Sequence, residues 1–253
     1  FRDPWTNIDF YDKLMLTKRA DRKHRQLEQK VLQSADLTIV VNPEMADEFK
    51  KLGALNVKII TNGYDPEDFK EMEYNPTGKF EIIHIGSINK DRNPVEFWKV
   101  ASEIIEENEN FANDLNISQI GLTDHSVLEE FKRNSLNSYV EIIPYKPHEE
   151  AMKEAAKASM LLLPLNNTPN AKGITTGKLF EYLALHRPIF CIGPIDGDAA
   201  KIIRECEAGI TIDFQDKDKM KSVLLDFYSK FNDSDPSLVS TSSKIRKYSR
   251  PYL

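Results

Sequence analysis

The sequence predicts an α/β protein built around a doubly wound parallel sheet. Short, nearly continuous apolar runs alternate along the chain with longer segments of helical character. Strands that are apolar throughout are typical of parallel sheets covered by helices on both faces. Regular alternation of strand and helix indicates successive strand–helix–strand units with right-handed crossovers.

These patterns assign most of the chain to strands and helices. Strands are predicted at Leu37–Val41, Val57–Ile60, Phe80–Ile85, Ile117–Ile120, Tyr139–Ile143, Met160–Pro164, Ile189–Ile192 and Ile210–Asp213. Helices are predicted at Arg19–Ser34, Pro43–Leu52, Pro94–Asn108, His125–Asn134, His148–Lys157, Lys178–His186, Ala199–Glu205 and Lys217–Phe231.

Turn residues interrupt the alternation of strands and helices once, between Thr61 and Lys79. The interruption carries Asn62-Gly63, Asp65-Pro66, Asn75-Pro76 and Gly78, which are turn and linker signals. We therefore predict four parts: a domain remnant at 1–62, a linker at 63–79, a complete doubly wound domain at 80–231, and a polar loop with a returning helical segment at 232–253. That last helix is expected at Lys244–Arg250. Two strands are too few for a core, so residues 1–62 are expected to be the tail of a preceding domain, and the chain a piece of a longer protein.

Composition narrows the class of protein. Of the 253 residues, 40% are hydrophobic and 29% are charged, as in ordinary globular proteins. The net charge of −6 argues against a duplex nucleic-acid partner, which needs a basic face. Cys191 and Cys206 are interpreted as reduced packing residues, consistent with a cytoplasmic setting. No apolar run approaches the roughly 20 residues of a membrane span, and no signal peptide is found.

The strongest candidate site is a Gly/Thr loop that opens into a helix. Thr175, Thr176 and Gly177 lead to Lys178 in the first turn and to Glu181 three residues later. Unpaired N–H groups at a helix amino end favour a bound phosphate, and Lys178 adds a full positive charge. Glu181 is positioned to accept two sugar hydroxyls. The alternative is that Lys178 and Glu181 form a solvated i, i+3 ion pair.

A second candidate is the loop after the predicted strand at 80–85. Gly86 allows close approach of a ligand, Ser87 can donate a hydrogen bond, and Lys90 or Arg92 can meet phosphate charge. Such a loop would lie at the carboxyl end of its strand, where doubly wound sheets bind ligands. The alternative is an ordinary solvated connection.

Two further loops follow predicted strands. Pro144–Pro147 could read a nucleobase edge, with Tyr145 as an apolar wall, or its prolines could simply shape a turn. The polar loop Leu165–Asn170 is a natural place for sugar contacts.

Other residues favour plainer interpretations. His84 lies within a strand and is read as a core histidine, and the remaining histidines lack metal-ligand spacing. A Walker phosphate loop and a Gly-x-Ser-x-Gly elbow are absent. The basic helical segment 18–25 is read as a solvated face, or alternatively as a contact with an anionic membrane surface.

The ordered series of segments resembles the GT-B fold glycosyltransferases of family four, of the bacterial polysaccharide-synthesis type. The resemblance covers nearly the whole chain, and its opening segment is similar to the one that closes the acceptor domain's cleft. The matching segments are Arg2-Asp3-Pro4-Trp5, Ser34–Asn42, Ile59–Asp65, Gly177–Ala184 and Arg187-Pro188-Ile189.

The resemblance implies two Rossmann-like domains and retaining transfer of a sugar from a nucleoside diphosphate sugar, without metal or other cofactor. It implies that Glu181 binds the ribose and that Leu179 and Phe180 lie beside the diphosphate. Gly86 and Ser87 would face the phosphates across the cleft. The acceptor would be a glycan or a lipid-linked sugar, reached from the cytoplasmic side of the membrane.

Two positions depart from the family pattern. Gly173 stands where the family commonly has a second glutamate, and Ser87 stands where a basic residue often follows the first loop's glycine. Lys178 and Arg92 are the candidates to supply the missing contacts and to stabilise the leaving diphosphate. Most of the acceptor-binding domain would be missing, so we expect donor binding with little or no transfer.

Two other functions share the architecture. A nucleotide-sugar epimerase would need catalytic carboxylates and histidines from both domains, and the scattered histidines disfavour it. A non-catalytic nucleotide-sugar-binding module would bind the donor without turning it over.

Overall fold

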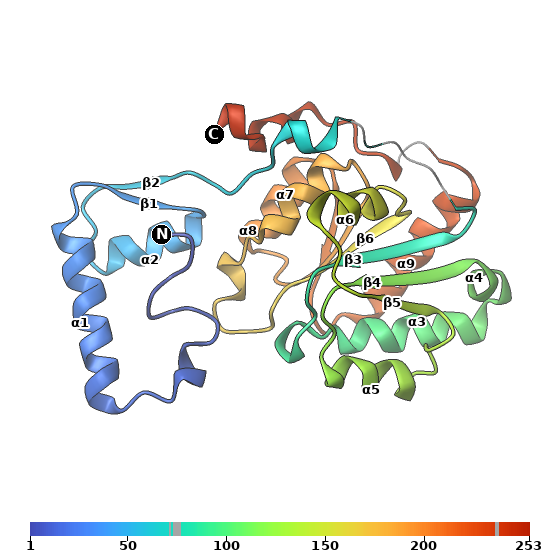
Figure 1. Ribbon diagram of the computed structural model, residues 1–253, viewed down its shortest axis with the longest axis horizontal. Coiled ribbons are helices and arrows are strands. Elements are labelled where there is room, and N and C mark those ends of the chain that lie inside the picture. Colours follow the sequence, from blue (N-terminus) through green and yellow to red (C-terminus); the bar gives the residue numbers. More distant parts are fainter. Residues whose placement is uncertain (71, 73–76, 236–237) are drawn as a thin grey trace.

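The computed structural model describes residues 1–253 except 71, 73–76 and 236–237 (Figure 1). Its strands are β1 (Thr38–Val40), β2 (Val57–Ile59), β3 (Phe80–Ile85), β4 (Leu115–Ile120), β5 (Val140–Ile143), β6 (Met160–Pro164), β7 (Ile189–Ile192) and β8 (Gly209–Ile212). Its α-helices are α1 (Lys18–Ser34), α2 (Pro43–Lys51), α3 (Val95–Glu107), α4 (Glu109–Asp114), α5 (His125–Arg133), α6 (His148–Ala155), α7 (Gly177–Ala184), α8 (Asp198–Glu205) and α9 (Lys217–Asn232).

The larger sheet has six parallel strands in the order β5-β4-β3-β6-β7-β8. The chain adds strands outward from β3 to one edge and then returns, so that β6 pairs with the other side of β3. The order therefore reverses between β3 and β6, the point at which open α/β sheets bind ligands. This confirms the doubly wound parallel sheet that the sequence predicts.

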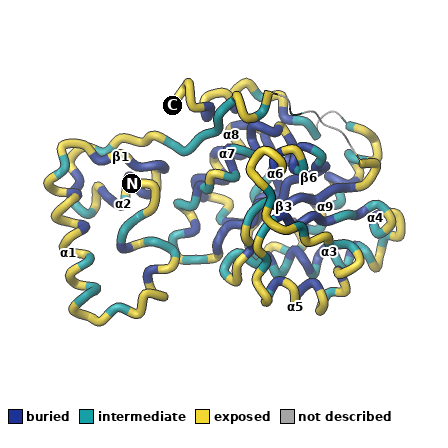
Figure 2. The backbone as a smooth tube through the Cα atoms, viewed as in Figure 1, coloured by how far each residue is buried: buried dark blue, intermediate teal, exposed yellow. Residues whose placement is uncertain are grey.

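Two apolar layers cover this sheet because successive strand residues face opposite sides. Met160 and Leu162 of β6 point into the layer formed with α3, α5 and α9, whereas Leu161 and Leu163 point into the layer formed with α6, α7 and α8. Figure 2 shows the strands as the buried centre of the molecule. Both cysteines, Cys191 and Cys206, are buried there with free thiols.

The first part of the chain has its own small apolar cluster. β1 and β2 form a two-stranded parallel sheet, and α2 and α1 pack against it around the fully buried Phe49 and Leu32. We call residues 1–60, with this sheet, the N-terminal unit. Ile39 and Ile59, which the register places on opposite faces of this sheet, stay 41% and 45% exposed, so neither face is fully covered. In Figure 1 the unit lies opposite the carboxyl ends of the large sheet's strands.

The end of the chain runs beside the connection between the two sheets. Tyr64 N–H donates to the Tyr248 carbonyl (3.1 Å), and Arg250 N–H donates to the Tyr64 carbonyl (2.9 Å). At Gly63 an added Cβ would lie 2.4 Å from the Tyr248 carbonyl oxygen and 2.5 Å from a methyl group of Leu253. The connection and the chain end are therefore in close contact.

Two helical details differ from the sequence prediction. The segment predicted as helix at Lys244–Arg250 forms 3₁₀-helices at Ser243–Tyr248 and Arg250–Tyr252. Ile245 and Tyr248 are both buried at a spacing of three, which suits three residues per turn. The prediction also missed α4, which begins where the Asn108 side chain accepts the Phe111 N–H (3.0 Å). The predicted turn at Asn75-Pro76 lies outside the described residues.

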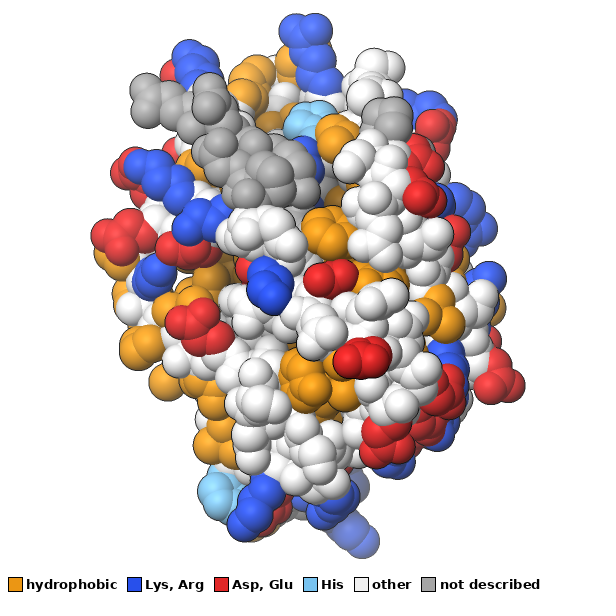
Figure 3. All heavy atoms as spheres, turned by 90° about the vertical axis from the view of Figure 1, so that its right-hand side faces the viewer, with side chains coloured by type: hydrophobic (Ala, Val, Ile, Leu, Met, Phe, Trp, Pro, Cys, Tyr) orange, Lys and Arg blue, Asp and Glu red, His pale blue; other side chains and the backbone are white. Residues whose placement is uncertain are grey.

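Figure 3 shows the opposite end of the molecule, which faces away from the N-terminal unit. Basic and acidic side chains are interspersed there, and apolar side chains occur in small groups among the charged ones. The surface charge at this end is therefore mixed rather than of one sign.

We predict that Gly209→Ala destabilises the large sheet by about 3 kcal/mol, combining backbone strain and overpacking. Gly209 has φ +149°, and a Cβ there would lie 2.1 Å from the carbonyl oxygen of its β7 partner Ile189. Urea denaturation measures the loss. Gly78→Ala is the control, because φ is +80° but nothing lies within 4 Å of the added Cβ. Strain alone should cost about 1 kcal/mol, and equal losses would show that the contact with Ile189 is unimportant.

Candidate functional site

The candidate site lies where β3 and β6 end beside each other. The loop after β3 contains Gly86 and Arg92, and the loop after β6 leads from Leu165 to the start of α7 at Gly177. Tyr182 of α7 ties these segments together, because its hydroxyl accepts the Ile85 N–H (2.9 Å). The fold thus brings two of the predicted loops to one edge of the sheet.

The Lys178 side chain lies directly over the backbone of Gly86. A Cβ on Gly86 would lie 2.5 Å from Lys178 Cε and 2.8 Å from its Nζ, and Gly86 has φ +103°. Any side chain at this position would therefore displace the ammonium group. Only glycine satisfies both the left-handed backbone and the close approach.

Lys178 is a cation with little compensation. Burial and the nearby charge of Arg92 lower the pKa of Lys178 to about 8, and Glu181 only partly opposes this. Among the described residues no carboxylate forms an ion pair with Lys178. The carboxylate of Glu181 contacts His148 instead, with 3.0 Å between His148 Nε2 and Glu181 Oε1. The alternative of a solvated Lys178–Glu181 pair is therefore wrong.

Arg92 is held beside Lys178 by neutral acceptors. Its Nε donates to Asn166 Oδ1 (2.9 Å), and its Nη1 donates to the Ser87 carbonyl (3.1 Å). Burial lowers the pKa of Arg92. Asn166 in turn donates to the carboxylate of Asp9, which belongs to the N-terminal unit. Two cations thus converge on a site where each raises the cost of charging the other.

The amino end of α7 has free hydrogen-bonding groups. Thr176 precedes the helix, but its side chain makes no capping hydrogen bond. In the part of the chain that the structure describes, Thr175 Oγ1 and Thr176 Oγ1 are buried without a partner. Within the same residues no hydrogen bond uses the backbone N–H of Gly177 or Lys178. An anion would satisfy these donors.

Four predicted site residues lie apart from this centre or reach it only through their backbone. Leu179 and Phe180 are fully buried, so their side chains belong to the core. Lys90 is exposed, and its charge acts on Asp124. Tyr145 is 82% exposed on its loop.

His84 behaves as the core histidine that the sequence suggests. Its Nδ1 lies 2.8 Å from the Leu162 carbonyl oxygen. Burial, and secondarily the charge of Lys178, lower the pKa of His84 to about 3. It is therefore neutral at physiological pH.

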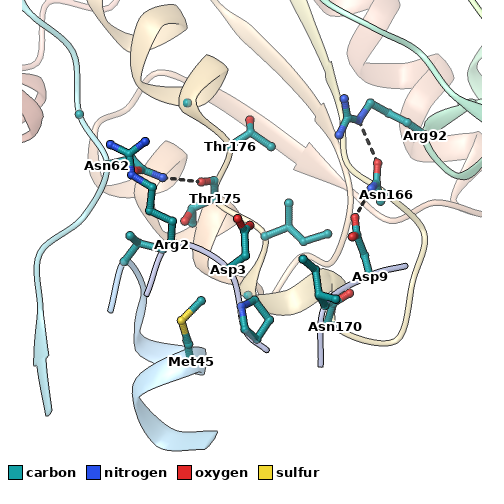
Figure 4. A pocket seen from close by; sticks show the side chains of 17 residues that line it. Arg2, Asp3, Asp9, Met45, Asn62, Arg92, Asn166, Asn170, Thr175 and Thr176 are labelled. Atoms are coloured by element: carbon teal, nitrogen blue, oxygen red, sulfur yellow. Dashed lines mark hydrogen bonds between the residues drawn. The ribbon is translucent and has the colours of Figure 1, made fainter. Parts of the chain in front are cut away.

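A cavity of about 430 Å³ lies between the amino end of α7 and the N-terminal unit (Figure 4). Its wall brings together Thr175, Thr176, Gly177 and Arg92 from the large-sheet side. The facing wall contains Arg2, Asp3, Pro4, Ile8, Asp9, Val41, Met45, Asn62 and Gly63. Figure 4 shows the Asp3 side chain directed into this space.

Polar contacts join the N-terminal unit and its connection to the loops of the site. Asn42 Nδ2 donates to the Gly173 carbonyl (2.7 Å), and Asn62 Nδ2 donates to the Thr175 carbonyl (3.3 Å). Asn42 belongs to a segment that carries the family resemblance, but Asp9 had no sequence signal. His148 likewise had no sequence signal that set it apart from the other scattered histidines.

Comparison with known proteins establishes the fold. No protein-family model matches the sequence, and no curated protein matches it significantly. Sucrose-phosphate synthase from Thermosynechococcus elongatus superposes with a TM-score of 0.67 at 14% identity, over 93% of this chain and 59% of that one. A glycosyltransferase from Rickettsia africae gives 0.70 at 10% identity, over 91% and 64%. HepE of Anabaena, solved with UDP and glucose, gives 0.69 at 10% identity, over 94% and 65%.

These similarities show that the chain has a GT-B-like fold. The chain spans 59% to 65% of the length of these three structures. Among the described residues, no helix has the length and apolar character of a membrane span.

We predict that Lys178→Met stabilises the protein by about 1–3 kcal/mol at neutral pH, because the buried charge is removed. The pKa is about 8 in the folded state against an ordinary value of 10.5, so the unfolded chain holds the proton more tightly. The gain should be full below pH 8 and should fade as the pH rises toward 10.5. Urea denaturation across this range measures it.

The matched control is Lys172→Met, because Lys172 is exposed and paired with Asp196 (2.5 Å). That change should give no gain at any pH. A Lys178→Met variant that behaved like this control would contradict the description of Lys178 as an uncompensated cation.

Proposed function

We propose that the chain is part of a glycosyltransferase that moves a sugar from a nucleoside diphosphate sugar to a glycan or lipid-linked acceptor. The observation that carries this proposal is the placement of Lys178 over Gly86, beside Arg92 and the free amino end of α7. Positive charge without a carboxylate partner, next to unused N–H donors, suits a diphosphate. The likeness to the structure described as a glycosyltransferase from Rickettsia africae supports the same class.

We further propose a division of the chain into parts. Residues 1–62 would be the end of an acceptor-binding domain, 63–79 the linker, 80–231 the donor-binding domain and 232–253 the returning segment. The separate apolar cluster of the N-terminal unit supports this division. So does the incomplete burial of its two-stranded sheet, in which Ile39 and Ile59 are exposed.

In this proposal the site assists departure of the nucleoside diphosphate. Negative charge grows on the leaving diphosphate as the sugar bond breaks, and Lys178, Arg92 and the α7 amino end would stabilise it. Glu181, one turn further along, would accept ribose hydroxyls. In this proposal these cations would make a metal ion unnecessary.

The transferred sugar is proposed to lie in the cavity beside α7. Position 173 cannot easily hold the family's second glutamate, because a Cβ there would lie 3.3 Å from Glu44 Cβ of the N-terminal unit. The carboxylates of Asp3 and Asp9 line the cavity instead and can accept sugar hydroxyls. Retention of configuration is the outcome that the family resemblance implies.

The acceptor side of the proposal includes the cytoplasmic face of a membrane. Helix α1 carries Lys18, Arg19, Arg22 and Lys23 as exposed cations. Exposed lysines and arginines on one helix are attracted to anionic lipid headgroups.

We predict that nucleoside diphosphates raise the melting temperature of the protein. Saturation at 100 times Kd should add about 2.7 kcal/mol, which corresponds to several degrees. The panel comprises uridine, guanosine, adenosine and thymidine diphosphates, free and with sugars attached. Lys178→Ala should weaken even the free diphosphates, and Glu181→Gln should weaken ribonucleotides more than deoxyribonucleotides.

Lys217→Ala is the control for this panel, because Lys217 pairs with Glu103 (3.0 Å) on helices α9 and α3. Unchanged affinities in both site variants would remove Lys178 and Glu181 from the site. No binding by the wild-type chain would overturn the proposed function.

We also predict that the 253-residue chain binds donor but transfers sugar slowly or not at all, because the proposed acceptor-binding domain is represented by its last part only. Release of nucleoside diphosphate is measured with and without a glycan acceptor, and donor binding is measured in the same sample. Full turnover on an acceptor would contradict the prediction. An epimerised sugar formed without acceptor would instead identify an epimerase.

A further inference from the structure

His148 contacts Glu181, but His148 has no role in the proposed function. His148 is the first residue of α6 and follows the loop 144–147, whereas Glu181 lies in α7. His148 Nε2 and Glu181 Oε1 are 3.0 Å apart. Two residues that are 33 positions apart therefore meet at the carboxylate that is proposed to bind ribose.

This contact adds little to the stability of the fold. The side chains of His148 and Glu181 are 50% and 27% exposed. Exposed pairs of this kind contribute little to the free energy of unfolding. The contact instead affects the orientation of the Glu181 carboxylate.

Glu181 interacts with two neighbouring side chains. The carboxylate acts on the charge of Lys178, at the proposed diphosphate position. It also contacts His148, which directly follows the loop 144–147. The carboxylate that is proposed to bind ribose therefore interacts with a residue of its own helix α7 and with the first residue of α6.

A hydrogen bond to one carboxylate oxygen fixes the direction of the other. A free glutamate side chain on a helix samples several rotamers, and ordering it on binding costs free energy. An N–H donated by His148 to Oε1 holds one rotamer before the ligand arrives. Oε2, which has no hydrogen-bond partner among the described residues, is then left to accept the ribose hydroxyls.

We propose that His148 is a positioning residue for ribose recognition, which acts by orienting the carboxylate of Glu181. The inference rests on the proposed function, because it assumes a nucleotide in the site. It adds a contact between the first residue of α6 and the carboxylate on α7.

The test compares His148→Leu with His148→Gln, whose side-chain amide keeps an N–H donor. Affinities are measured by calorimetry for uridine, guanosine and adenosine diphosphates, each with ribose and with 2′-deoxyribose. His148→Leu should weaken the ribose forms by about three- to tenfold, the effect of losing one oriented hydrogen bond. The deoxyribose forms should change by less than about twofold, and His148→Gln should restore most of the ribose affinity.

His125→Leu is the matched control, because His125 also opens a helix, α5, and lies 3.7 Å from a glutamate, Glu129. It should leave every affinity unchanged. If wild-type protein binds a diphosphate but His148→Leu binds it equally well, the inference on His148 fails alone. Equal weakening of ribose and deoxyribose forms would also overturn it. No binding by the wild type would overturn the proposed function itself.

Discussion

The structure of the site depends on one contact, the Lys178 ammonium group lying over the Gly86 backbone. It joins the loop after β3 to the first turn of α7, across the point where the strand order reverses. The contact needs a glycine in a left-handed conformation and a lysine that accepts burial without a carboxylate partner. The sequence around Gly86 does not predict Lys178, and the sequence around Lys178 does not predict Gly86. Their combination therefore supports the proposal that the site binds an anion.

Much of the fold could be predicted because the strands are buried on both faces. The limits of β3, β6 and β7 agree with the predicted limits, since these strands are nearly continuous apolar runs in the core. The short helix α4 escaped prediction because Asn108 ends one helix and caps the next without a turn residue between them. The segment near Tyr248 was expected to be helical, but its tighter 3₁₀ form depends on contacts with α7 and the linker.

The site was predictable in its loops but less so in its contacts. The residue types around Gly86 and Gly177 made phosphate binding one of two interpretations, the other being solvated loops, and the fold places both segments together. The partner of Glu181 was not predictable, because i, i+3 spacing favoured Lys178 while the chain fold brings His148 within 3.0 Å. Asp9 was missed for the same reason. Its contact with Asn166 joins residues that are 157 positions apart, and no periodic pattern records such a contact.

The close packing at Gly63 affects how the two halves of the molecule can move. The connection passes under Tyr248 and Leu253, and Tyr64 exchanges backbone hydrogen bonds with the chain end on both sides. Arg250 adds an ion pair to Asp65 at 3.1 Å. The two halves are thus joined by two hydrogen-bonded segments rather than by a single one. A rotation that separated the halves would have to bend both segments together, which limits the directions in which the halves can rotate.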